Sequence, residues 1–237
     1  SIPLAPSRLE PYAPDAEGEP ILPPRRDEVT PQDRPTPRAL KSDNRFLRGT
    51  ITHALLEHLP SLPAARRAET AKAFVASRGK DLTASQRTSI VRETLAILDA
   101  STFAALFSES SRAEVPISAV IPRPRGRGPA LKLSGQIDRL AVTEREVLIV
   151  DYKTNRPPPR DVIRVAPAYL FQLAAYVLAL SEIYPDKQIL CALLWTDGPN
   201  LMEIPGALIN QYITRLWDLD PASLSAAEGA GSAGPPP

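Results

Sequence analysis

The first half of the chain carries apolar residues at helical spacing. The stretch 48–60, RGTITHALLEHLP, places Thr50 where the N-cap of a short helix is expected. A second pattern, at 63–79, ends on a glycine, which commonly stops helices. A third covers 83–100, and 101–108 is a candidate short turn. The pattern therefore predicts a helical N-terminal part.

From residue 112 the sequence changes to runs rich in β-branched residues, separated by turn residues. These runs predict three consecutive strands, at 112–122, 130–142 and 146–152. Helical spacing then returns, followed by an apolar run typical of a buried strand and by a closing helical segment, at 166–184, 188–196 and 206–219. We expect an α/β fold in which a central mixed sheet is flanked by helices.

Proline and small residues dominate both ends of the chain. Residues 1–43 hold ten of the 27 prolines and show almost no apolar periodicity, so we expect a linker or extended arm. Residues 220–237 are rich in alanine, glycine and proline, and a disordered low-complexity tail is expected there. The folded domain is thereby predicted to span 44–219.

Two aspartates interrupt the second and third predicted strands. We expect Glu144 and Arg145 to form the tip of an antiparallel hairpin. In that register Asp138 lies directly across from Asp151, with Cβ atoms about 4.5–5.5 Å apart. A slip of one residue in the turn would send the two carboxylates to opposite faces of the sheet, so the prediction depends on the turn.

Alternation along the third strand places Lys153 on the face of Asp151 and turns Tyr152 away. Two neighbouring carboxylates repel each other unless one is protonated or a cation neutralises both. Oxygen ligands favour a hard ion, so Mg²⁺ is the expected cofactor, with Mn²⁺ as a substitute. An adjacent lysine can offset charge on a phosphate under attack, as in phosphodiester hydrolysis. The spacing alone leaves a surface salt bridge at a strand end as an alternative.

Four stretches in this order, RGTITH, GQIDRL, VLIVDYKTNRPPP and YLFQLAAY, resemble the RecB-type branch of the PD-(D/E)XK nucleases. The resemblance is closest to the C-terminal nuclease domain of AddA-type helicase-nucleases and covers roughly residues 45–205. It implies a restriction-endonuclease-like core. The metal ligands that it implies are His53, Asp138, Asp151 and the backbone carbonyl of Tyr152. The catalytic residues that it implies are Asp138, Asp151, Lys153, Gln172 and Tyr176.

Several of these residues also have simpler explanations. A lone histidine near a helix start, such as His53, is commonly a capping or core residue, and His58 points well around the helix from it. Gln172 and Tyr176 fall with Tyr169 on one stripe of a helix, which can face the site or be the polar edge of a packed helix. On the neighbouring strand, we regard Glu114 as a supporting residue at most.

Charge and cysteine content narrow the classes of protein. The formal net charge is +1, so a polyanion would bind at a local site rather than through bulk charge. Candidate phosphate contacts are the arginines of RPRGRG, residues 123–128, together with Arg139 and Arg156. The single cysteine, Cys191, excludes an internal disulfide and a four-cysteine iron–sulfur cluster, and its apolar surroundings indicate a buried thiol. A reducing cytoplasm and the absence of any membrane association are expected.

From the resemblance, we expect a Mg²⁺-dependent deoxyribonuclease that processes double-strand DNA breaks for recombination repair and cuts the 3′-terminated strand. The expected partners are DNA, as single-stranded ends from a helicase, the helicase portion of the same full-length chain, and an AddB-type subunit. The sequence starts without methionine and carries no GxxxxGK[ST] loop, so the motor is expected elsewhere in a longer chain. The alternative is a non-catalytic module that keeps the fold to dock a partner subunit or to guide DNA.

Overall fold

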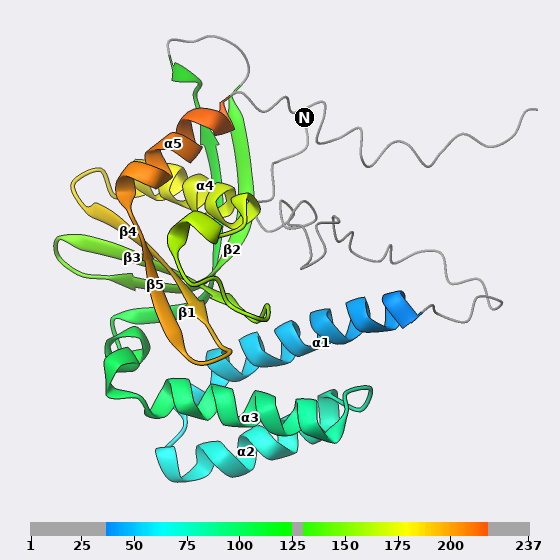
Figure 1. The fold of residues 1–237 in the computed structure, drawn as a ribbon. Helices are drawn as coiled ribbons and strands as arrows, with labels where there is room; N and C mark the ends of the chain where they lie inside the picture. The colour runs from blue at the N-terminus through cyan, green and yellow to red at the C-terminus, as the bar shows by residue number, and fades with distance from the viewer. Residues whose placement is uncertain (1–36, 125–129, 218–237) are drawn as a thin grey trace, which may run out of the picture.

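The computed structural model describes residues 37–124 and 130–217, with side chains from Asn44 onward. Within these residues, a five-stranded mixed sheet in the order β1-β2-β3-β4-β5 has helices on both faces (Figure 1). The α-helices are α1 (Pro37–His58), α2 (Ala64–Arg78), α3 (Ala84–Asp99), α4 (Pro167–Ile183) and α5 (Gly206–Leu216). The strands are β1 (Ser111–Ile121), β2 (Leu131–Val142), β3 (Glu146–Lys153), β4 (Gln188–Trp195) and β5 (Asn200–Ile204). Short 3₁₀ segments are η2 (Leu59–Ser61), η3 (Ser101–Phe107) and η5 (Val162–Arg164). The predicted α/β class with a helical N-terminal part is confirmed.

Helix α1 is longer than the pattern predicts. It begins at Pro37, inside the stretch expected as an arm, and proline is well tolerated in a first helical turn. Thr50 is not an N-cap, because its hydroxyl donates to the carbonyl of Phe46 one turn earlier, over 3.0 Å. The remainder of the expected arm and the whole expected tail lie outside the described residues.

The next two helices begin and end as their sequences predict. The amide of Gly79, just past the end of α2, donates to the carbonyl of Val75 over 2.8 Å. Helix α3 starts with a capping box, in which Thr83 accepts from the amide of Gln86 and the Gln86 side chain accepts from the amide of Thr83. These local bonds satisfy helix-end groups without help from any tertiary contact.

Strand order follows from short connections and one crossover. β1, β2 and β3 form an antiparallel meander, whereas β4 runs parallel to β3, and α4 supplies the crossover that a parallel neighbour requires. The sequence prediction missed β5, which pairs antiparallel with β4. It is only five residues long, and the signal for it is the preceding Asp197-Gly198 turn, in which Gly198 has a φ of 65°.

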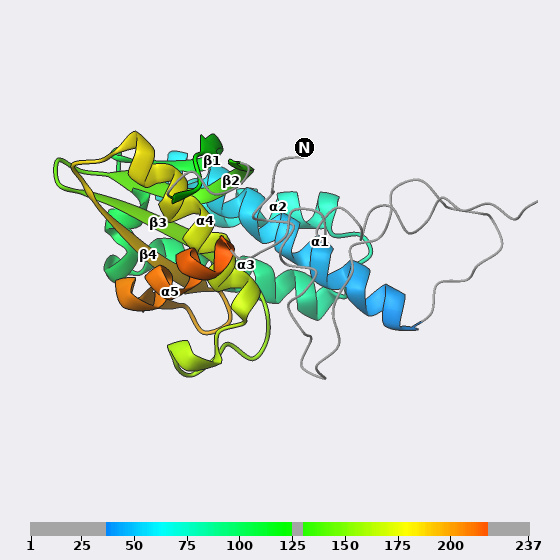
Figure 2. The ribbon, with the colours of Figure 1, turned by 90° about the horizontal axis from the view of Figure 1, so that it is seen from above.

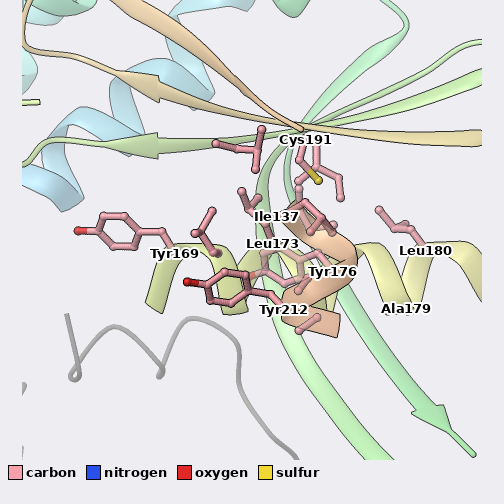
Figure 3. Close-up of a cluster of buried hydrophobic side chains, with 14 of the residues drawn as sticks. Ile137, Tyr169, Leu173, Tyr176, Ala179, Leu180, Cys191 and Tyr212 are labelled. Atoms are coloured by element: carbon pink, nitrogen blue, oxygen red, sulfur yellow. The ribbon is translucent and has the colours of Figure 1, made fainter. Parts of the chain in front are cut away.

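The main core lies between the sheet and the helices α4 and α5. These two helices contact each other and cover one face of the sheet (Figures 1 and 2). Side chains from α4, β2 and β4 meet there, among them Leu173, Ile137 and Cys191 (Figure 3). Helix α4 is buried on most sides, so it fixes the positions of the polar residues that it carries.

The opposite face of the sheet packs on the first three helices. Val150 and Tyr152 of β3 contact a cluster that includes Leu56 of α1 and Ile97 of α3. A third cluster joins α1, α2 and α3 to one another. Because β3 alternates strictly between the two faces, Asp151 is turned towards the α4 side, and it lies opposite Tyr152, as predicted.

Candidate metal centre

Strands β2 and β3 pair in the register that the hairpin prediction gives. Arg139 pairs with Val150, and one further step along this register places Asp138 across from Asp151. Oδ2 of Asp138 accepts a hydrogen bond from the backbone amide of Tyr152 over 2.7 Å. The Asp138 carboxylate is therefore fixed at the end of β3 by a bond to the backbone.

Helix α1 brings an imidazole to the same point. Nδ1 of His53 lies 3.3 Å from Oδ1 of Asp138, and Nε2 of His53 lies 3.2 Å from the carbonyl oxygen of Tyr152. The His53 ring also meets the Tyr152 ring edge to face, with centroids 5.5 Å apart. His53 thus contacts two of the other three groups expected to bind metal, the Asp138 carboxylate and the Tyr152 carbonyl.

The surroundings favour a charged imidazole in the metal-free protein. Burial alone lowers the pKa of His53, but the charge of Asp138 and its hydrogen bond outweigh burial and raise this pKa to about 9. For Asp138, burial raises the pKa, while the His53 charge and the hydrogen bonds from His53 and Tyr152 lower it further than burial raises it. The pair is an imidazolium beside a carboxylate at neutral pH.

Strand β2 is irregular at Asp138. Ile137 and Leu140 both belong to the core beneath α4, so two residues rather than one separate neighbouring core positions there. Across from this point on β1, Glu114 has a φ of 49° and is skipped in otherwise continuous pairing with β2. Such a φ costs a residue with a side chain about 1–2 kcal/mol, so packing around it must hold it.

This distortion places Glu114 beside the other two ligands. His53, Glu114 and Asp138 each offer one donor atom, and these atoms lie within 4.8 Å of one another. Burial, followed by the charge of Asp138, raises the pKa of Glu114. We expected only a supporting role for Glu114, and no sequence signal predicts its backbone conformation.

Asp151 and Lys153 form a second group of charged side chains, next to the cluster of His53, Glu114 and Asp138. Nζ of Lys153 lies 2.8 Å from Oδ2 of Asp151, and both side chains are 4% exposed. The ammonium group also donates to Oε1 of Gln172 over 3.1 Å and sits 3.9 Å from the centroid of the Tyr169 ring. Asp151 thus pairs with Lys153 and lies outside the His53, Glu114 and Asp138 cluster.

The polar stripe of α4, formed by Tyr169, Gln172 and Tyr176, faces the Asp151–Lys153 pair. Tyr169 and Gln172 contact Lys153, whereas Tyr176 bonds to β2. The Tyr169 hydroxyl donates to Oδ1 of Asn155 over 2.8 Å, which holds the chain that leaves β3. The Tyr176 hydroxyl donates to the carbonyl of Gln136 over 2.6 Å, and burial raises its pKa. Tyr176 therefore holds β2 against α4, two residues before Asp138.

Three further expectations concern arginines and a histidine. A contact between Arg139 and phosphate stays a prediction: Arg139 lines the groove described below, but its buried guanidinium donates to the Tyr152 hydroxyl and to the carbonyl of Leu56, on the α1 side of the sheet. Strand alternation explains this, because its side chain points to the face opposite the core beneath α4. Arg156 is partly exposed and pairs with acids. His58 is exposed beside Glu57.

Residues 125–129, with two of the three arginines of RPRGRG, lie outside the described residues. Cys191 is buried, as predicted, and burial raises the pKa of its thiol to about 12. Among the residues described, no helix combines the length and apolar character that a membrane span requires.

The donors suit a hard divalent ion. An ion with ligands at about 2.1 Å separates them by roughly 3–4 Å, so donors within 4.8 Å need only a small closure. One imidazole with carboxylate oxygens suits a hard or borderline divalent ion rather than a soft metal. A groove of about 700 Å³ opens beside the cluster, bounded by the end of α1, η3, β1 and Arg139, with Glu114 in its wall.

A family model for the PD-(D/E)XK nuclease superfamily matches residues 28–204, well over half of the chain. The chain belongs to this superfamily, whose nucleases use divalent metal ions. A comparison with curated proteins found no match.

Two solved structures show a distant likeness. One is described as the crystal structure of SSO0001, with 14% identity, a TM-score of 0.31, and coverage of 70% of this chain and 81% of that one. The other, protein VC1899 from Vibrio cholerae, has 13% identity, a TM-score of 0.28, and coverage of 78% and 57%. The family assignment rests on the family model.

Proposed function

We propose that this chain is a Mg²⁺- or Mn²⁺-dependent deoxyribonuclease domain. The observation that carries the proposal is the meeting of His53, Glu114 and Asp138 within 4.8 Å, next to the buried Asp151–Lys153 pair. Two carboxylates held this close, those of Glu114 and Asp138, repel each other unless one is protonated or a cation lies between them. The superfamily supplies the reaction class, which is metal-dependent phosphodiester cleavage.

Some residues of the site would bind the metal ion, and Lys153 would stabilise charge on the substrate. His53, Asp138 and Glu114 would hold the ion, with the carbonyl of Tyr152 as a neighbouring oxygen and Asp151 as the acid facing Asp138. A bound divalent ion would activate a water and neutralise charge at the scissile phosphate.

Lys153 would stabilise negative charge on the phosphate, because its ammonium group is already oriented by Gln172 and Tyr169 and is shielded from bulk water. Gln172 acts through Lys153. The bond from Tyr176 to the carbonyl of Gln136 keeps β2 in place.

The finer proposal concerns the biological setting. The four stretches shared with AddA-type proteins support a nuclease domain of a helicase-nuclease in double-strand break repair, acting on the 3′-terminated strand. Its partners would then be single-stranded DNA ends, a helicase motor in the same longer chain, and an AddB-type subunit. Strand preference and partners rest on the resemblance.

Cleavage of end-labelled single-stranded and duplex DNA tests the activity. The chain should cut in the presence of Mg²⁺ or Mn²⁺ and not in a chelator, and Asp151→Asn should abolish cutting. Asp161→Asn is the matched control, because Asp161 is an exposed aspartate near Arg164 in the loop before α4. Early loss of a 3′-terminal label would support the proposed polarity.

Two results would count against the proposal. Equal cutting by the wild-type and Asp151→Asn proteins would remove Asp151 from the reaction. Tight DNA binding without Mn²⁺ binding or cutting would favour the non-catalytic docking module instead.

A further inference from the structure

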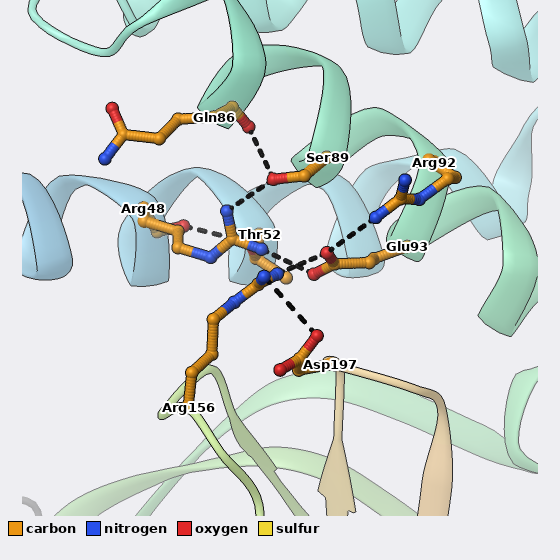
Figure 4. A network of polar contacts seen from close by, with 8 residues as sticks. All are labelled: Arg48, Thr52, Gln86, Ser89, Arg92, Glu93, Arg156 and Asp197. Carbon is orange, nitrogen blue, oxygen red and sulfur yellow. Dashed lines mark hydrogen bonds and ion pairs between the residues drawn. The ribbon is translucent and has the colours of Figure 1, made fainter. Parts of the chain in front are cut away.

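Three arginines converge on one buried carboxylate away from the metal centre, that of Glu93 on α3 (Figure 4). Glu93 is only 4% exposed. Its Oε2 accepts from Nη2 of Arg48 over 2.5 Å. Its Oε1 accepts from Arg156 and lies 3.7 Å from Nη2 of Arg92. The two oxygens of one carboxylate therefore serve different elements of the fold.

The first contact joins α3 to the helix that carries His53. Arg48 is buried on α1 and also donates from Nη1 to Ser89 of α3 over 2.9 Å. Burial lowers the pKa of Arg48, and the charge of Glu93 partly offsets this. Arg48 lies five residues before His53, which is about 7.5 Å along a helix axis. The position of α1 near His53 is thus tied to Glu93.

The second contact joins α3 to the loop that leaves β3. Arg156 follows Lys153 by three residues, and its Nη1 also lies 3.4 Å from Oδ1 of Asp197 in the β4–β5 turn. The same loop passes close to α1, since a Cβ placed on Gly49 would be 3.5 Å from Oγ1 of Thr154. Glu93 stands where α1, α3 and this loop meet.

We propose that Glu93 is a positioning residue for the metal centre, which holds the helix carrying His53 against the loop that follows Asp151 and Lys153. Its effect on metal binding rests on the proposed function. Metal ligands must be held within about 0.5 Å of their working geometry, so a small shift of α1 relative to the sheet would weaken binding.

Stability alone gives little reason to keep this network. Burying an ion pair costs desolvation energy, and apolar side chains of similar size commonly hold two helices as well or better. A carboxylate differs in being directional, because hydrogen bonds to its oxygens prefer the lone-pair directions near the carboxylate plane. The Glu93 carboxylate therefore holds both α1 and the loop after β3 in fixed positions relative to α3.

Glu93 and Arg156 carry opposite charges, so replacing them should change cation affinity in opposite directions if charge alone mattered. Replacing Glu93 removes a negative charge, which by itself weakens the binding of a cation. Replacing Arg156 removes a positive charge, which by itself strengthens cation binding. If Glu93 acts by positioning, both changes weaken metal binding, so Arg156→Met is the decisive variant.

The experiment uses the full chain with Glu93→Gln, Arg156→Met and the control Arg164→Met. Arg164 is an exposed arginine beside Asp161 on the same connection between β3 and α4. Amide hydrogen exchange of the metal-free proteins measures whether the contacts of Glu93 hold α1 in place. Calorimetric titration with Mn²⁺ measures the effect of these contacts on metal affinity. We expect faster exchange in α1 for the first two variants. Their Mn²⁺ affinity should fall about tenfold. The control should match the wild type.

Arg156→Met keeps the buried Arg48–Glu93 pair, so it decides the matter even where Glu93→Gln fails to fold. Unchanged or tighter Mn²⁺ binding by Arg156→Met would overturn the inference, and so would faster exchange without any loss of affinity, which indicates a purely structural joint. A wild-type chain that binds no Mn²⁺ would instead overturn the proposed function, and the role at the metal centre with it.

Discussion

His53 on α1 and Asp138 on β2 meet over 3.3 Å, from Nδ1 to Oδ1, although their elements are far apart in the sequence. The contact raises the pKa of His53 to about 9. The metal-free site therefore already holds one positive charge, that of a proton, between the groups expected to bind a metal ion. Proton and metal compete for the same ring.

This competition predicts that Mn²⁺ binding releases a proton. An imidazole binds metal only when neutral, so at neutral pH about one proton should leave for each ion bound. Affinity should rise about tenfold per unit of pH until the pKa of about 9 is passed. Calorimetry in two buffers of different ionisation enthalpy measures the released proton. His53→Asn should bind more weakly and release none, and equal release by both proteins would contradict the assignment.

The folding stability of the metal-free protein should depend on pH in the opposite direction: it should fall as pH rises, whereas Mn²⁺ affinity should rise. A histidine whose pKa is raised by folding stabilises the fold most below its ordinary pKa of 6.5, and this contribution is lost as pH rises to about 9. Thermal unfolding of the metal-free chain should occur at lower temperature as pH increases across this range. The dependence should flatten in His53→Asn. A wild-type profile without such a decline would show that the ion pair does not form.

Local geometry could be predicted because it depends on neighbours along the chain. The β2–β3 register follows from the turn at Glu144 and Arg145, and the side of the sheet on which Asp151 lies follows from alternation. The same alternation shows why Arg139 does not face Asp138, a step that the sequence prediction did not take. Strands and helices with clear periodicity were found, and the short β5 was not.

Long-range geometry could not be predicted from the residues alone. Nothing in the sequence near His53 places it beside β2, and only the resemblance to known nucleases suggested its role. The position of Glu114 depends on a backbone distortion that arises where β1 pairs with the irregular part of β2. The two contacts of Glu93 join three elements that periodicity treats as independent.

Asp138 has a structural bond that can be separated from its charge. Asp138→Asn keeps an acceptor for the buried amide of Tyr152, whereas Asp138→Ala leaves that amide without its partner. Both variants should lose Mn²⁺ binding, but only the alanine variant should be destabilised by the unpaired amide, at about 1–3 kcal/mol. Chemical denaturation and Mn²⁺ titration measure the two effects. Retained Mn²⁺ affinity in Asp138→Asn would remove this carboxylate from the ligand set.

Glu114 combines a strained backbone with a site for metal binding. Glycine adopts a φ of 49° without the strain that a Cβ causes, so Glu114→Gly should be more stable than Glu114→Ala by about 1 kcal/mol. Both variants should bind Mn²⁺ more weakly than the wild type, because neither has a carboxylate. Glu114→Gln separates charge from conformation. If Glu114→Gln binds Mn²⁺ as tightly as the wild type, Glu114 is structural only.

Lys153 and Asp151 neutralise each other where both are 4% exposed. Lys153→Met leaves the Asp151 carboxylate buried without its cation, which should destabilise the metal-free protein by about 3–5 kcal/mol. The double variant Lys153→Met with Asp151→Asn removes both charges and should recover most of that stability, but not DNA cleavage.

Metal ions distinguish the two roles of Asp151. If Asp151 binds metal, Mn²⁺ should raise the unfolding temperature of Lys153→Met more than that of the wild type, because the ion replaces the missing ammonium as a counter-charge. The double variant should lack this extra gain. Cleavage by Lys153→Met should fall at least about 100-fold at saturating Mn²⁺, since the ion does not supply the charge that Lys153 directs at the phosphate. An equal gain in unfolding temperature for wild type and Lys153→Met would show that Asp151 serves only to orient the lysine.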